Sequence, residues 1–284
     1  MSAAPADRNR SPTRGSNRKF LIGVARASGG AIVFGLPLLM TMEMWWLGFY
    51  IERARLALLL FISIPLLVGL SHYAGFEETF GWQDDLVNSF VAYAVGFVAS
   101  GVLVSVLGVI ESGMAIDEIF AEIALLALPA GIGASLAASQ FGSEEDEEKK
   151  KRRFTRYEGE LFLMAVGAIF LALNVAPTDE MELIGHMMSP WHKIGLAVLS
   201  LLIMHAFVYA VDFSGQALVP PNTPAWSLFL RFTLPGYAIA LLISLYLHWT
   251  FGRIDGTDIH TVIGITVVLG FPAAVGAAAA RLVI

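Results

Sequence analysis

The sequence predicts an all-α, polytopic membrane protein with eight transmembrane helices. Hydrophobic residues make up 56% of the 284 residues and charged residues only 15%, against about 45–50% and about 25% in soluble domains. The mean hydropathy is +0.68. The apolar residues gather in runs of about 20, the length that a helix needs to cross a bilayer. The alternating pattern of a membrane β-barrel is missing.

Eight apolar segments are predicted to span the membrane. They are predicted to be helices because lipid offers backbone groups no hydrogen-bonding partner. The fifth is the shortest, and it runs into Pro177. In chain order the segments cover residues 28–50, 55–75, 88–110, 118–139, 158–177, 193–213, 226–250 and 258–282.

Two polar stretches lie outside these segments. Residues 1–19 are basic and rich in Ser and Pro, which predicts a disordered tail. Residues 140–157 contain an acidic block followed by a basic block, which predicts a solvated linker. The linker divides the chain into two halves, residues 20–139 and 158–284, with four spans each.

Lysine and arginine predict the orientation of the chain. Six basic residues precede or open the first span, six lie between spans four and five, and Arg281 is near the end of the chain. With eight spans all of these fall on one side, and only four basic residues fall on the other. Both termini, the tail and the linker are therefore predicted to be cytoplasmic, in a bacterial inner (plasma) membrane.

The two halves are predicted to be parallel repeats, because each copy holds an even number of spans. Three matches occur in the same order and at nearly constant spacing, which favours duplication over chance identity. GAIVFGLPLLMTMEM (30–44) aligns with GAIFLALNVAPTDEM (167–181), YAVGFVASGVL (93–103) with YAIALLISLYL (237–247), and LPAGIGASLAA (128–138) with FPAAVGAAAAR (271–281).

Glu43 is the first functional signal, because it is a carboxylate in an apolar segment. By helix rise it lies about 22 Å into the first span, where an ionised acid normally faces a cavity or a partner. This predicts a cation ligand or a titrating carboxylate. An equally weighted alternative is a helix that ends early and leaves Glu43 at the headgroups beside Trp45 and Trp46. The counterpart of Glu43 in the second half, Glu180, lies in a polar stretch that favours an exposed loop acid.

The fourth span opens with three acids, Asp117, Glu118 and Glu122. Glu118 and Glu122 are four residues apart and share one helix face, so a shared cation or proton would relieve their repulsion. The eighth span offers Asp258 and His260 in the corresponding region. Carboxylates and imidazoles suit proton handling, or hard divalent cations if other oxygens complete the shell. No compact metal motif is present, so neither a metal site nor a cofactor is predicted.

His205 lies near the middle of the sixth span. An imidazole at that depth could relay protons. The favoured alternative is a neutral histidine that hydrogen-bonds a neighbouring helix.

The predicted outer face carries eleven acids against four bases. Such a face would concentrate cations through its field, an effect that salt weakens. The alternative is that cytoplasmic enrichment merely leaves this face poor in bases, although this does not explain the acids that enter spans. The acids are Glu43, Glu52, Glu111, Asp117, Glu118, Glu122, Asp179, Glu180, Glu182, Asp255 and Asp258, and the bases are Arg53, Arg55, Lys193 and Arg253.

The block GGAIVFGLPLLMTMEMWW (29–46), the eight spans and the charged central linker carry a resemblance. The chain resembles an uncharacterised bacterial family known only as integral membrane proteins. The similarity covers most of the chain beyond the basic tail. It implies no activity, cofactor or site residue.

The residues favour a cation or proton-coupled transporter or channel that uses membrane-embedded carboxylates. The alternative is a non-transporting scaffold or sensor, whose basic tail and linker bind anionic lipid or a cytoplasmic partner. No nucleophile or nucleotide motif is present, so an enzyme is not predicted. The absence of cysteine excludes disulfides and thiolate sites. The net charge of −6 gives no reason to expect nucleic acid, and the expected partners are the lipid bilayer and protons or small cations, with the oligomeric state left open.

Overall fold

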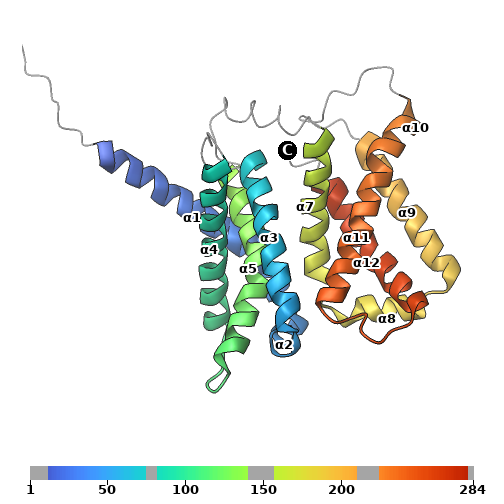
Figure 1. Ribbon diagram of the computed structural model, residues 1–284, viewed down its shortest axis with the longest axis horizontal. Coiled ribbons are helices and arrows are strands. Elements are labelled where there is room, and N and C mark those ends of the chain that lie inside the picture. The colour runs from blue at the N-terminus through green and yellow to red at the C-terminus, as the bar shows by residue number, and fades with distance from the viewer. Residues whose placement is uncertain (1–11, 75–81, 140–156, 210–223, 281–284) are drawn as a thin grey trace, which may run out of the picture.

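A computed structural model describes residues 12–74, 82–139, 157–209 and 224–280 (Figure 1). These residues form helices and no strand, which confirms the all-helical class. The first half contains α1 (Pro12–Leu39), α2 (Met42–Tyr50), α3 (Arg53–Ala74), α4 (Trp82–Val106) and α5 (Ile116–Ser139). The second half contains α7 (Tyr157–Val175), α8 (Asp179–Met187), α9 (Pro190–Tyr209), α10 (Ala225–Leu228), the π-helical turn η1 (Phe229–Thr233), α11 (Leu234–Thr250) and α12 (Ile259–Ala280).

Within these ranges eight helices are long and apolar enough to cross a membrane, as the sequence predicts. Such helices satisfy their own backbone hydrogen bonds, which lipid requires. Their apolar spans are Leu21–Leu39, Arg53–Tyr73, Trp82–Val106, Ile116–Ala137, Tyr157–Val175, Pro190–Phe207, Trp226–Thr250 and Ile259–Ala280.

The N-terminal helix differs from the expected tail and first span. Helix α1 begins at Pro12, within the stretch 1–19 that the sequence assigns to a tail. Proline is favoured at the first position of a helix because the missing N–H is one that the helix end would leave unbonded. Residues 1–11 and the linker residues 140–156 lie outside the described residues.

The first span ends at Leu39 rather than at residue 50. The hydroxyl of Thr41 donates to the carbonyl of Leu38 at 2.7 Å, and the indole N–H of Trp45 donates to the carbonyl of Leu39 at 2.8 Å. These bonds satisfy carbonyls that a helix end leaves without partners. The chain then restarts as the short helix α2, so Glu43 lies in the first turn of α2, outside the candidate span.

The fifth span ends in the same way. Pro177 follows α7, and the hydroxyl of Thr178 donates to the carbonyl of Val175 at 2.8 Å. Helix α8 then begins at Asp179 and has nine residues, as α2 has. Both half-chains therefore place a short helix after their first span.

The helices form two groups that lie side by side (Figure 1). One group consists of α1 to α5 and the other of α7 to α12. Helix α5 is the most buried span of the first group, and α12 is the most buried span of the second. Helix α1 packs on α5 and helix α7 on α12. The two groups meet through α1, α3 and α5 on one side and α7 and α11 on the other.

Glycine allows the closest helix approach in both groups. A Cβ atom on Gly30 would overlap the backbone of Gly133 on α5, and one on Gly167 would overlap the backbone of Gly276 on α12. Small residues permit such backbone contact between membrane helices. The same contact therefore joins α1 to α5 and α7 to α12.

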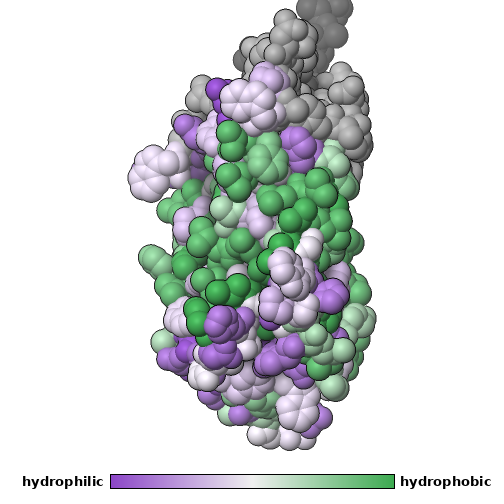
Figure 2. Space-filling model, turned by 90° about the vertical axis from the view of Figure 1, so that its right-hand side faces the viewer, coloured by the Kyte–Doolittle hydropathy of each residue, from purple (hydrophilic) through white to green (hydrophobic). Residues whose placement is uncertain are grey.

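The surface matches a membrane environment. Figure 2 shows a broad band of hydrophobic side chains above a hydrophilic lower end. Exposed tryptophans lie near both ends of the helices: Trp46 and Trp191 near one end, and Trp82 and Trp226 near the other. Tryptophan is enriched at the two water interfaces of a bilayer, so this placement supports a bilayer around the apolar band.

Candidate functional site

Most of the acidic residues that the structure describes lie at one end of the molecule, here called the α2/α8 end. It consists of α2, α8 and the connections α4–α5 and α11–α12, and lies at the bottom of Figure 1. The positive-φ glycines of the two connections correspond: Gly108 at 72° and Gly113 at 110° in the first, and Gly252 at 73° and Gly256 at 71° in the second. Such φ values favour glycine because a Cβ atom is strained there. Each connection therefore reverses the chain direction with two glycines at positive φ.

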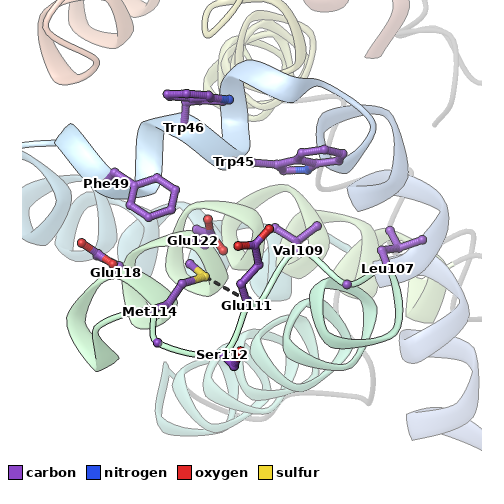
Figure 3. A pocket seen from close by; sticks show the side chains of 12 residues that line it. Trp45, Trp46, Phe49, Leu107, Val109, Glu111, Ser112, Met114, Glu118 and Glu122 are labelled. Carbon is purple, nitrogen blue, oxygen red and sulfur yellow. Dashed lines mark hydrogen bonds between the residues drawn. The ribbon is translucent and has the colours of Figure 1, made fainter.

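A pocket of about 670 Å³ opens at this end in the first half. Helix α2 forms one side of it, and the α4–α5 connection with the first turns of α5 forms the other (Figure 3). The lining residues are Trp45, Trp46, Phe49, Leu107, Gly108, Val109, Glu111, Ser112, Gly113, Met114, Glu118 and Glu122.

Glu122 is the deepest acid of this pocket. Its exposed fraction is 2%, and neither carboxylate oxygen has a hydrogen-bond partner among the described residues. Its side chain lies under α2, where Gly48 leaves room for it; a Cβ atom at Gly48 would overlap Glu122 Cγ. A buried carboxylate without partners carries a large desolvation cost. The site is therefore chemically incomplete without a proton or a cation.

Two further acids line the pocket nearer to solvent. Glu118 is half-buried, and its Oε2 accepts the backbone N–H of Ala115 at 3.1 Å, which caps the start of α5. Glu111 is exposed, and its backbone N–H donates to the sulfur of Met114 at 3.1 Å. Figure 3 shows the Glu111 carboxylate beside that of Glu122, below α2. The acids thus form a series from the exposed Glu111 to the buried Glu122.

Aromatic rings cover the pocket from α2. Phe49 points toward the carboxylates in Figure 3, and Trp45 lies above Glu111. The Trp45 ring is fixed by its bond to Leu39. Trp46 is exposed and lies on the edge of α2 away from the acids.

Other predicted site residues have structural partners instead. Asp117 is exposed and forms an ion pair with Arg53 at 2.9 Å. Asp258 caps α12 by accepting the backbone N–H groups of His260 at 2.9 Å and Thr261 at 3.1 Å, and the hydroxyl of Thr261 at 2.6 Å. These bonds, the Thr261 hydroxyl first, lower the pKa of Asp258 from its usual 3.8.

Glu43, Glu180 and His260 do not line the pocket. Glu43 is half-buried in the first turn of α2, and Glu180 is exposed in the first turn of α8. His260 is exposed in the first turn of α12. The pocket therefore brings together Glu118 and Glu122 of the predicted set and leaves these three outside.

Tyr50, the last residue of α2, is affected by charges from both half-chains. Burial raises the pKa of Tyr50; the charge of Arg253 opposes this, and Asp179 and Glu43 add to it. Charges of both half-chains thus act on one phenol at the boundary between them.

His205 has a neighbouring-helix partner, which is the favoured sequence interpretation. Its Nδ1 lies 3.0 Å from the hydroxyl of Thr233 in η1, and its ring meets Phe229 edge-on. The bond joins α9 to η1.

The second half has an arginine where the first half has the pocket-lining Val109. Arg253, which follows Gly252 as Val109 follows Gly108, pairs with Asp179 of α8 at 2.7 Å. Arg253 also approaches Glu182 at 3.7 Å and donates to the carbonyl of Pro177. The side chain of Arg253 therefore lies at the N-terminal end of α8.

The core position under α8 also differs. Gly185 of α8 lies against Ile265 of α12 as Gly48 of α2 lies against Glu122 of α5. Ile265 is fully buried. An alkyl side chain thus stands where the first half has a carboxylate.

An arginine links the two half-chains at the α2/α8 end. Arg55 of α3 donates two hydrogen bonds to Asp255, at 2.8 and 3.0 Å, and one to the carbonyl of Trp249 at 2.6 Å. Its guanidinium lies 4.8 Å from the centre of the Trp249 ring, and it also pairs with Glu52 at 2.8 Å.

Ion pairs thus use three of the four bases at this end. Their acidic partners are Asp117, Glu52, Asp255, Asp179 and Glu182. Of the remaining acids of this end, three line the pocket: Glu111, Glu118 and Glu122. Three of the six acids of this end that have no ion pair among the described residues therefore share one pocket.

Sequence reasoning missed several residues. The i, i+4 spacing of Glu118 and Glu122 predicts that these two acids lie together. It gives no indication of Phe49 or Trp45, which reach the pocket only because the first helix ends at Leu39. His248, which is buried in α11 with its Nε2 3.1 Å from the carbonyl of Ile265, was also missed. A histidine in an apolar segment is the signal that could have found it.

A metal centre made of protein side chains is not present within the described ranges, where three or more His, Asp or Glu never converge closely enough to hold an ion.

A family model described as "Putative integral membrane protein (DUF2391)" matches residues 23–284. No curated protein and no solved structure matches the chain.

Proposed function

Because the chain belongs to the DUF2391 family of integral membrane proteins, we propose that it is a transporter or channel that takes up protons or small cations at Glu122. The α2/α8 end is its extracytoplasmic entrance. Glu111 and Glu118 attract the cation from solvent, and Glu122 receives it between α2 and α5.

One observation carries the proposal: Glu122 is buried to 98% with both carboxylate oxygens unpartnered, on the wall of an open pocket. Membrane-embedded acids normally face a cavity or a partner and mark ion or proton pathways. A structural role normally supplies hydrogen bonds to each buried oxygen, and Glu122 has none from the described residues.

The charge balance supports the direction of uptake. Bases pair with five acids outside the pocket, whereas none of the three acids that line it has an ion pair among the described residues. A negative cleft with apolar walls raises the local cation concentration. Six Lys or Arg residues before or within the first span and six in the linker belong to the segments next to the opposite end, which supports a cytoplasmic placement of that end and of both termini.

The scaffold for this function is an internal duplication. Its support is the agreement of the three aligned segments with independent features: nine-residue α2 and α8, the Thr41 and Thr178 bonds, the close glycine contacts and the paired positive-φ glycines. The most buried helices, α5 and α12, carry Pro129 and Pro272 at matching places. Proline bends a helix by removing one backbone hydrogen bond, so bending of α5 at Pro129 is the proposed route from Glu122 to the other end.

Flux measurements test the proposal. The purified chain is reconstituted into vesicles that contain a pH dye, and separately a potassium or sodium dye, and an ion gradient is imposed. We expect Glu122→Gln to abolish at least nine-tenths of the flux. Glu180→Gln, an exposed acid at the same end that does not line the pocket, is the matched control and should retain it. Equal flux in wild type and Glu122→Gln would exclude Glu122 as the binding group.

A second candidate is a non-transporting sensor. It is favoured by the shape of the pocket, because its lining residues come from α2, the α4–α5 connection and the first turns of α5, and none lies deeper in α5 than Glu122. A sensor would bind its cation without flux and would pass the signal to the basic N-terminal tail and linker, which suit anionic lipid. Binding that depends on Glu122 with no flux of any tested ion, and a phenotype lost on deletion of residues 1–19 or 144–156, would favour the sensor.

A further inference from the structure

We propose that the pocket between α2 and α5 is built for an organic ammonium group rather than for a bare metal ion. This inference rests on the proposed function, since it assigns the ligand class of the same Glu122 site.

The volume of the pocket favours a small organic molecule over a bare metal ion. Its volume of about 670 Å³ lies within the range of about 300–1,000 Å³ that is usual for small-molecule sites. A dehydrated Ca²⁺ or Mg²⁺ ion instead needs six or more oxygens at about 2.0–2.6 Å. No group of three or more His, Asp or Glu side chains that could hold a metal ion occurs in the part of the chain that the structure describes.

The charge distribution favours a cation with one buried end. Glu111 is exposed, Glu118 is half-buried and Glu122 is 2% exposed. An entering ammonium group therefore meets carboxylates of increasing burial. At the deepest of them it supplies the counter-charge that the protein itself does not provide.

The aromatic wall favours an organic cation. Phe49 and Trp45 of α2 lie over the acids. Aromatic faces attract ammonium groups through the ring quadrupole, most strongly for weakly hydrated quaternary ammonium. Carboxylates opposite aromatic rings thus complement an ammonium group with an apolar body, whereas small inorganic cations gain little from the rings.

The second half shows how this end accommodates an organic cation. At α8, the guanidinium of Arg253 contacts Asp179, Glu182 and the carbonyl of Pro177. The first half has Val109 at the place after the corresponding glycine and no arginine in the pocket lining. One half therefore carries its own organic cation, and the other leaves acids for a cation from outside.

Such a group could come from a free solute or from a lipid headgroup, because the pocket opens beside the interfacial Trp46. Both sources present the same chemistry, an alkylated ammonium attached to a flexible chain. The lipid composition of the experiment distinguishes them.

Binding of choline tests the inference. Choline and its neutral isostere 3,3-dimethylbutan-1-ol are titrated calorimetrically into the full chain, in detergent, in phosphatidylglycerol vesicles and in vesicles that also contain phosphatidylcholine. We expect choline to bind saturably and the isostere not to bind. Glu122→Gln should weaken choline binding at least tenfold, and Phe49→Leu several-fold. The controls Glu180→Gln and Phe61→Leu, the latter an exposed ring on α3, should leave it unchanged.

The outcomes separate ligand class, ligand source and transport. If choline binds in phosphatidylglycerol vesicles but not when phosphatidylcholine is present, the result supports the ammonium site and identifies the lipid headgroup as the occupant. If choline binds in both kinds of vesicle, the result supports a free solute as the occupant. Equal binding of the neutral isostere, equal binding by Glu122→Gln, or no choline binding in detergent and in phosphatidylglycerol would overturn the inference. Glu122-dependent proton or sodium flux without choline binding would overturn it and leave the proposed function standing, whereas choline binding without any flux would support it and remove transport.

Discussion

Gly48 of α2 lies directly against the side chain of Glu122 on α5, and a Cβ atom at Gly48 would overlap Glu122 Cγ. The contact explains how a carboxylate becomes buried at the edge of the membrane: the short helix has no side chain at this point and settles onto the acid. The same contact between Gly185 and Ile265 in the second half buries an alkyl group instead. The same helix contact therefore buries a carboxylate in the first half and an alkyl side chain in the second.

The first prediction concerns Gly48→Ala. The added methyl group should push α2 away from α5 and cost about 1–3 kcal/mol of stability, as overpacking of a close contact does. Thermal unfolding in detergent should show a lower midpoint than wild type. Gly29→Ala is the matched control, because no other atom lies within 4 Å of a Cβ there; it should be neutral or slightly stabilising, since alanine is the better helix former. An unchanged midpoint for Gly48→Ala would contradict the contact.

The second prediction is that Glu122→Ile stabilises the protein. This change gives α5 the residue that α12 has at the corresponding place, Ile265. It removes a buried group without hydrogen-bond partners, whose burial costs about 1–3 kcal/mol. The unfolding midpoint at pH 7 should therefore rise while choline binding and flux are lost, a trade of stability against function. The control Glu118→Gln, a half-buried acid that caps α5, should not raise it. A lower midpoint for Glu122→Ile would indicate that the carboxylate has a stabilising partner.

The sequence predicts the spans well because apolar length is itself the physical requirement of the bilayer. All eight expected segments have a matching helix. The first one is displaced, because Met40 to Tyr50 is almost as apolar as the span before it and only Thr41 marks the break. Composition alone does not distinguish a continuous helix from two helices that pack at an angle.

The site is predicted less completely than the fold. The i, i+4 spacing identifies Glu118 and Glu122 because both lie on one helix. The pocket also needs Phe49 and Glu111, which come from other elements. Their approach depends on the break after Leu39 and on the turn at Gly108 and Gly113, and neither has a periodic signal. Asp258 and Asp117, equally acidic in the sequence, have local partners that only coordinates reveal.

The third prediction concerns pH. Hydrogen bonds from Thr261 lower the pKa of Asp258 in the folded protein below its usual 3.8, so the ionised cap contributes stability that is fully present above that value and is lost as the pH falls through the lowered pKa. The midpoint difference between wild type and Asp258→Asn should therefore shrink as the pH falls from about 5 toward about 2 by that linkage. Unfolding measured across this range checks it. A difference that grows on acidification would contradict the cap.

The fourth prediction concerns the link between the half-chains. Arg55→Lys keeps the charge but loses the two-pronged bond to Asp255 and the stacking on Trp249, and lysine cannot reproduce the planar fork of arginine. The unfolding midpoint should fall. It should fall further than in Arg53→Lys, because the Arg53–Asp117 pair lies within one half and is exposed on both sides, with side-chain exposures of 44% and 68% against 15% for Arg55. Exposed pairs contribute little. Co-purification of the two halves as separate chains, residues 1–148 and 149–284, gives a second measurement, since Arg55→Lys should weaken their association and Arg53→Lys should not. Equal effects of the two substitutions would mean that the halves are held together by the apolar contacts of α1, α3 and α5 with α7 and α11 alone.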